Sequence, residues 1–158
     1  MKKAGFLHKL HHRKKLVMVE PSEEIKDAYL LRSAESLSSA KTLLRAGNLK
    51  DAVALAYYAM YHALLALLFR VGIKCENHTA AILLMKEVFG LDDQEISNAK
   101  SERVDQQYYV DFKVTKEEVS QAVIIAEEFI GQLNDYLARL TEKDIEEYRR
   151  RADQLMKA

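Results

Sequence analysis

Four polar aromatic side chains fall within six residues near the middle of the chain. They are Tyr57, Tyr58, Tyr61 and His62, and only an alanine and a methionine separate them. In a helix, Tyr58, Tyr61 and His62 share one face because they are three and four residues apart. Buried phenol and imidazole groups need hydrogen-bond partners, since an unpaired polar group costs about 1–3 kcal/mol inside a protein. The pattern predicts either a polar layer that fixes helix register or a pocket whose aromatic faces hold a nucleobase.

A second candidate lies at the end of a polar segment, where Arg103 is followed by Tyr108 and Tyr109. An arginine beside amide and phenolic groups at the end of a helix suits contact with a phosphate. The alternative is an ordinary surface ion pair between Arg103 and a nearby acid. Both interpretations are compatible with the sequence.

The residues present exclude several kinds of catalytic and metal site. The five glycines are scattered singly, so there is no glycine-rich phosphate loop. None of the five histidines has a glutamate three residues before it, as helical di-iron sites require. Cys75 and His78 have a metal-like spacing, but two ligands do not make a site. The sequence therefore predicts no metal and no cofactor.

The composition is typical of a helical protein with one domain. Of its 158 residues, 49% are apolar and 30% are charged, and only five are glycine and one is proline. So few turn residues argue against β-sandwiches and barrels. Cys75 is the single cysteine, which excludes an intrachain disulfide and is typical of a reducing compartment. We therefore expect an all-α cytoplasmic protein without a secretion signal.

The formal net charge is zero, but basic and acidic residues are unevenly distributed along the chain. Residues 1–15 hold six basic side chains and three histidines but no acid, whereas the rest of the chain holds 18 basic and 24 acidic residues. Residues 1–21 are interpreted as a basic N-terminal segment that binds phosphate or an acidic neighbour, or else as a solvated, poorly ordered terminus.

Apolar periodicity and capping residues predict an up-and-down bundle over residues 22–140. Ser22 and a capping box at Thr115 begin helices, and single glycines end others. Ala52–Phe69 is free of charge, but a histidine and three tyrosines at its centre favour a buried bundle helix over a membrane span. Residues 73–77 and 108–114 are predicted as connections. Residues 141–158 are predicted as a charged helix that needs a partner to stay folded.

Several motifs carry a resemblance to a known family. They are Asn-Leu-Lys-Asp-Ala at 48–52, Ala-Tyr-Tyr-Ala-Met-Tyr-His-Ala at 56–63, His-Thr-Ala-Ala-Ile at 78–82, Arg103 to Tyr108, and Phe-Lys-Val-Thr-Lys-Glu-Glu at 112–118. Together they resemble the small stand-alone branch of the HEPN family (higher eukaryotes and prokaryotes nucleotide-binding domain) over about residues 25–135.

The resemblance implies a four- or five-helix bundle that forms a homodimer and works with a minimal nucleotidyltransferase, often in a toxin–antitoxin module. It also implies a groove that would hold a nucleotide, an RNA end or the partner. Its residues would be Tyr58, Tyr61, His62, His78, Arg103 and Tyr108. Nucleotidyltransferase partners of similar proteins can transfer AMP to a tyrosine, for which Tyr108 and Tyr109 are the candidates here.

The chain departs from the family's nuclease pattern at one position. Nuclease members carry a histidine four to six residues after the arginine, whereas Tyr108 and Tyr109 follow Arg103 here. A phenol with a pKa of about 10 is a poor general base at pH 7. This argues against efficient cleavage and favours a binding protein. The alternative is a metal-independent RNase toxin in which Arg103 and Tyr108 act with a relocated base, either His62 or His78.

Overall fold

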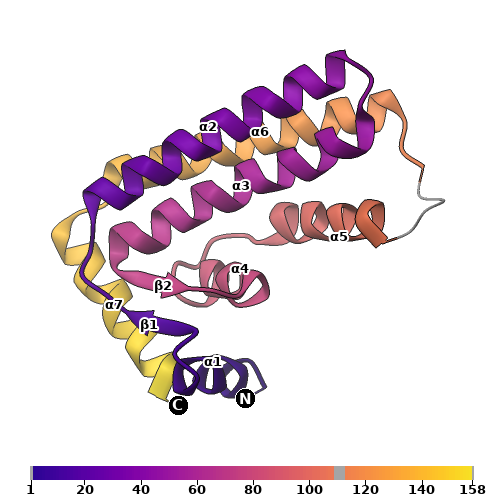
Figure 1. The fold of residues 1–158 in the computed structure, drawn as a ribbon. Helices are drawn as coiled ribbons and strands as arrows, with labels where there is room; N and C mark the ends of the chain where they lie inside the picture. Colours follow the sequence, from indigo (N-terminus) through magenta and orange to yellow (C-terminus); the bar gives the residue numbers. More distant parts are fainter. Residues whose placement is uncertain (1, 109–112, 158) are drawn as a thin grey trace.

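Seven helices and one small sheet make up the described part of the chain (Figure 1). The computed structural model describes residues 2–108 and 113–157. The elements are α1 (Lys2–His12), β1 (Leu16–Met18), α2 (Glu23–Arg45), α3 (Leu49–Val71), β2 (Ile73–Cys75), α4 (His78–Glu87), α5 (Gln94–Tyr108), α6 (Lys116–Arg139) and α7 (Glu142–Lys157). The predicted helical bundle with an extra charged C-terminal helix is confirmed.

The three longest helices, α2, α3 and α6, run side by side (Figure 1). The Ser22 hydroxyl caps α2 by accepting a hydrogen bond of 3.0 Å from the backbone N–H of Ile25. Gly47, at φ 81°, makes the tight turn that returns the chain as α3. At the start of α6, the Thr115 and Glu118 side chains form the predicted capping box. The tight turn at Gly47 accounts for the antiparallel packing of α2 and α3.

Helix α3 is the centre of the molecule. It contacts α2, α5 and α6 along its length, and 14 of its 23 residues are buried. By length and composition α3 could cross a membrane, but 72% of its most apolar stretch is buried against the other elements. The predicted assignment as a central bundle helix agrees with this burial.

A two-stranded sheet was not predicted. Gly72 ends α3 in the left-handed conformation at φ 84°, and the chain continues as β2 instead of an irregular connection. β2 pairs antiparallel with β1, with Leu16 opposite Cys75 and Met18 opposite Ile73. The prediction missed it because each strand has only three residues, too few for an alternating pattern to be recognised.

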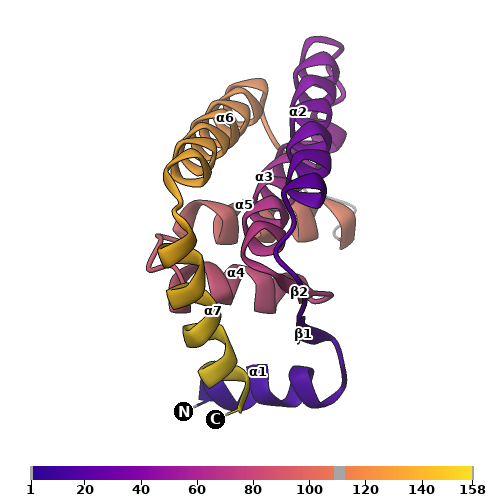
Figure 2. The ribbon, with the colours of Figure 1, turned by 90° about the vertical axis from the view of Figure 1, so that its left-hand side faces the viewer.

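The two ends of the chain pack against each other at one end of the bundle, where Figure 2 shows α1 beside α7. We call α1, β1 and α7 the terminal layer. The N-terminal residues form a helix and a strand, not a poorly ordered tail. Helix α7 is separate from α6 because Leu140 leaves the helical conformation at ψ 130°. It buries Ile145, Ala152 and Met156, so this chain's own residues supply the packing partner that the charged helix needs.

Candidate functional site

The tyrosines of α3 differ in how far they reach the surface. Tyr57 is fully buried and Tyr61 is 6% exposed, whereas Tyr58 and His62 are half-buried. This gradient follows from the packing of α2, α5 and α6 around α3. One side of the central helix therefore presents phenol and imidazole groups at the boundary between core and solvent.

His78 joins these tyrosines from α4. Asn77 caps this helix by accepting a hydrogen bond of 2.9 Å from the backbone N–H of Ala80, and His78 is the first residue of the helix. A hydrogen bond of 2.7 Å joins its Nδ1 to the hydroxyl of Tyr57. Its ring also stacks on that of Tyr61, with 3.8 Å between the centroids and 13° between the planes. Two buried tyrosines thus fix the position of one imidazole.

Arg103 approaches the same tyrosines from α5. Its Nη1 donates a hydrogen bond of 3.4 Å to the Tyr58 hydroxyl. The guanidinium carbon lies 5.4 Å from the ring centroid of Tyr57 and 5.6 Å from that of Tyr58, within the range of cation–π attraction. Arg103 is half-buried, so its charge is positioned by aromatic faces and still borders solvent.

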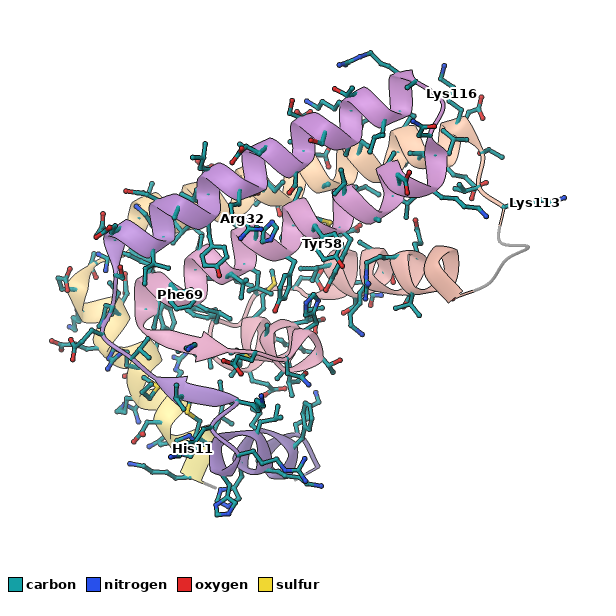
Figure 3. The ribbon with its side chains drawn as sticks, viewed as in Figure 1. His11, Arg32, Tyr58, Phe69, Lys113 and Lys116 are labelled. Carbon is teal, nitrogen blue, oxygen red and sulfur yellow. The ribbon has the colours of Figure 1, made fainter. Side chains whose placement is uncertain are left out.

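His62 extends the group toward α2. Its ring centroid lies 6.3 Å from that of Tyr58 and 6.0 Å from that of Tyr29. Its Nδ1 is buried and has no hydrogen-bond partner among the described residues. Figure 3 shows Arg32 and Tyr58 on the two helices that run side by side here. We call the whole group the Tyr–His–Arg cluster; its members are Tyr57, Tyr58, Tyr61, His62, His78 and Arg103.

Burial sets the protonation states within the cluster. It lowers the pKa of His78, and the positive charges of Arg103 and Lys100 lower it further. Burial likewise lowers the pKa of His62, with smaller contributions from Arg32 and His78. Both imidazoles are therefore neutral at pH 7.

Burial also raises the pKa of the Tyr57 and Tyr61 phenols well above their usual value. Both phenols therefore stay protonated at neutral pH. At pH 7 the cluster consists of neutral rings and hydroxyls beside one fixed guanidinium charge.

The structure brings together five of the six residues predicted to form the groove: Tyr58, Tyr61, His62, His78 and Arg103. Tyr108 is the last residue of α5, and Tyr109 lies outside the described residues. Sequence reasoning left Tyr57 out of the groove, although its hydroxyl holds His78. The available signal was its spacing of four residues from Tyr61, which places both rings on one side of α3.

A cavity of about 470 Å³ lies elsewhere, between α6 and the segment that joins α4 to α5. Its lining includes Leu91, Ile125, Phe129 and Tyr136, and no member of the Tyr–His–Arg cluster. Within the described ranges, no three His, Cys, Asp or Glu side chains lie close enough together to hold a metal ion. The cluster is thus a surface of aromatic rings and one cation, separate from this cavity.

Residues 27–136 match the family model of the HEPN domain, which covers most of the chain and every residue of the cluster. The chain belongs to the HEPN family. The match leaves out α1, β1 and α7, so the terminal layer lies outside the HEPN domain.

Two curated archaeal proteins are similar to this HEPN chain. "Putative toxin MJ0605" of Methanocaldococcus jannaschii is 28% identical over 134 residues, which cover 80% of this chain and 98% of the relative. "UPF0332 protein PH1297" of Pyrococcus horikoshii is 41% identical over 69 residues, which cover 44% of this chain and 45% of the relative. The second similarity thus spans less than half the length of that relative.

Proposed function

We propose that this HEPN protein binds single-stranded RNA at the Tyr–His–Arg cluster, as the toxin-type member of a two-protein module in the cytosol. The observation that carries the proposal is the Arg103 guanidinium, held against the faces of Tyr57 and Tyr58 beside a neutral His78. A planar guanidinium suits phosphate oxygens, and a half-buried tyrosine ring offers a face for base stacking.

The exposure of each side chain in the cluster indicates whether it would contact the RNA or position another residue. Tyr58 and Arg103 border solvent, so they would meet the base and the phosphate directly. Tyr57 and Tyr61 are buried, so they would act by positioning His78 and Arg103. The neutral imidazoles of His62 and His78 can each donate a hydrogen bond to a nucleotide or accept one from it.

Binding can be tested by fluorescence anisotropy with a labelled single-stranded RNA of four nucleotides in EDTA. Arg103→Ala should weaken binding about 10- to 100-fold, the range expected when a hydrogen bond to a charged group is lost. Arg45→Ala, which removes an exposed arginine from the last turn of α2, is the matched control and should bind like the wild type. Equal affinities for the two variants would refute the proposal.

The same proposal includes a homodimer and a nucleotidyltransferase partner. The resemblance described above and the word toxin in the name of the M. jannaschii relative support a partner protein. Co-expression with a nucleotidyltransferase encoded beside this protein should give a complex that co-purifies at a fixed ratio. Light scattering of the isolated chain should give twice the monomer mass, and a constant mass near that of one chain would refute the dimer.

A second candidate function is metal-independent RNA cleavage, because His78 lies in one cluster with Arg103. With its proton on Nδ1 and donated to Tyr57, His78 has a free electron pair on Nε2. Nε2 would remove the 2′-hydroxyl proton, and the 2′-oxygen would attack the adjacent phosphorus. Arg103 would stabilise the phosphorane charge, and the departing 5′-oxygen would take a proton from water. The hydroxide so formed would take the proton back from His78 Nε2, and the products would be a 2′,3′-cyclic phosphate and a 5′-hydroxyl.

Cleavage is tested in EDTA with RNA and with the same oligonucleotide carrying a single 2′-deoxy nucleotide. If His78 is the base, His78→Gln should slow cleavage at least about 100-fold. His12→Gln, at an exposed histidine of α1, should leave the rate unchanged. Intact RNA after prolonged incubation with the wild type would exclude this function and leave the binding proposal standing.

A further inference from the structure

Three positive charges on and after α1 have no partner within the described part of the chain. Lys3 and Lys15 form ion pairs with Glu87 and Glu76, at 3.2 Å and 3.4 Å. In contrast, the exposed side chains of Lys9, Arg13 and Lys14 make no hydrogen bond or ion pair with any described residue. We call these three residues the basic patch.

The basic patch is attached to the core of the protein. Leu7, Leu10 and Leu16 on either side of it are buried. His8 Nδ1 lies 2.9 Å from the backbone carbonyl of Met156 in α7, and His11 Nδ1 lies 2.9 Å from that of Leu16. The charges are therefore held at a defined place on the surface, as a binding site requires.

The turn that carries Arg13 and Lys14 lies near the His78 side of the Tyr–His–Arg cluster. The carbonyl of Lys15 accepts a hydrogen bond of 2.9 Å from the backbone N–H of Glu76, two residues before His78. Strand spacing of about 4.8 Å and a rise of about 3.4 Å per residue place the Lys15 backbone within roughly 12 Å of that of His78. In Figure 2 the turn after α1, the segment between β2 and α4, and the end of α5 lie along one side of the molecule.

The chemistry of the basic patch favours a polyanion over a protein surface. Protein interfaces are anchored by buried apolar and aromatic side chains. The large apolar side chains exposed among the described residues are Ile25, Leu31 and Ile124, none of which lies in the terminal layer. Phosphate groups need no apolar anchor, only exposed cations of the kind this patch presents.

We infer that Lys9, Arg13 and Lys14 bind backbone phosphates of the RNA strand whose neighbouring nucleotides occupy the Tyr–His–Arg cluster. This inference rests on the proposed function. It assigns the terminal layer, which lies outside the HEPN domain, the role of lengthening the RNA site. A short RNA would occupy the cluster alone, and a longer one would also cover the basic patch.

The test compares labelled single-stranded RNAs of 4 and 16 nucleotides over a range of salt concentrations. Each phosphate contact with a single strand contributes about 0.7 to the slope of log Kd against log salt concentration. For the 16-nucleotide RNA, Lys9→Gln/Arg13→Gln/Lys14→Gln should therefore lower this slope by about 2. The control Arg45→Gln/Lys116→Gln/Arg139→Gln removes the same charge from exposed sites on α2 and α6 and should keep the wild-type slope. Thermal melts would confirm that both variants fold.

The outcomes separate this inference from the proposed function. A lowered slope for the 16-nucleotide RNA with unchanged binding of the 4-nucleotide RNA supports the inference. Equal slopes for the two triple variants, with Arg103→Ala still weakening the short RNA, would overturn the inference alone. If the basic patch served an acidic protein instead, its variant would lose that protein without any change in RNA slope, which also overturns the inference. Absence of RNA binding by the wild type would overturn both.

Discussion

The HEPN domain and the terminal layer are held together by different kinds of interaction. In the domain, α3 buries 14 residues among neighbouring helices, and apolar area is the main source of stability. The terminal layer buries a smaller apolar set and adds polar anchors; its buried side chains are Leu7, Leu10, Leu16, Ile145, Ala152 and Met156. The foremost anchor is Arg149, whose Nη1 donates to the carbonyls of Val19, Val71 and Gly72 at 2.8, 2.9 and 3.2 Å. A single change should therefore cost more where one guanidinium bridges several carbonyls than where stability is spread over many apolar contacts.

Removal of the Arg149 side chain is the strongest test of this difference between the HEPN domain and the terminal layer. Arg149→Met keeps most of the side-chain volume but removes the guanidinium donor from all three carbonyls, of which that of Gly72 keeps the backbone N–H of Val19 as a donor. The change should lower the free energy of unfolding by about 3 kcal/mol. Arg150→Met is the matched control, because the neighbouring arginine is exposed and pairs with Glu147 on its own helix. That change should cost less than about 1 kcal/mol. Urea denaturation measures both.

Hydrogen exchange then locates the effect of Arg149→Met. Amides of α1 and α7 should lose protection while those of α3 keep theirs, because the anchor joins the layer to the end of α3. Uniform loss of protection across all helices would contradict the idea that the terminal layer is a separately held region.

A second change tests the polar part of the domain itself. Tyr57→Phe removes the hydroxyl that pairs with His78 Nδ1 and leaves that nitrogen without its partner, so we expect a loss of about 1–2 kcal/mol in a urea titration. Tyr61→Phe keeps the ring stacked on His78 and should cost less. If both variants were equally stable, the hydrogen bond would not hold the imidazole.

The helices of the domain could be predicted from the sequence because their signals are local and repeated. Ser22 and Thr115 cap helices by bonds within one turn, and the left-handed glycine at Gly72 ends α3 without reference to the rest of the fold. The β1–β2 pair and the helical N-terminus depend on contacts between residues far apart in the chain. Examples are the pairing of Leu16 with Cys75 and the bond from His8 to Met156, which no local pattern records.

In the candidate site too, local spacing predicted some residues, and others depend on contacts between distant parts of the chain. Tyr58, Tyr61 and His62 could be grouped by their spacing on one helix. Arg103 was a separate candidate because of its place at the end of a polar helix. The resemblance added His78 and joined both residues to the tyrosines, and the structure brings both to the same tyrosines. The role of Tyr57 was missed because it arises from a hydrogen bond across 21 residues of chain. Helix periodicity identifies residues on one face but not the partner that reaches that face from another helix.

The smallest expected effect concerns pH and compares the buried imidazoles with an exposed one. Burial holds the pKa of His78 and His62 below 6.5 in the folded protein, whereas in the unfolded chain both protonate near 6.5. Between those values the unfolded state binds more protons, so the free energy of unfolding falls as pH drops through this window and is constant above it.

Because both rings are half-exposed and screened by solvent, each should contribute less than about 1 kcal/mol. Urea titrations of the wild type and His78→Gln between pH 7.5 and 5.5 should show a shallower fall for the variant. His12→Gln should keep the wild-type profile. The raised pKa of Glu102, caused by burial, acts in the opposite direction but is common to all three proteins, so it cancels from the comparison. A profile for His78→Gln as steep as that of the wild type would show that His78 is protonated equally in the folded and unfolded states.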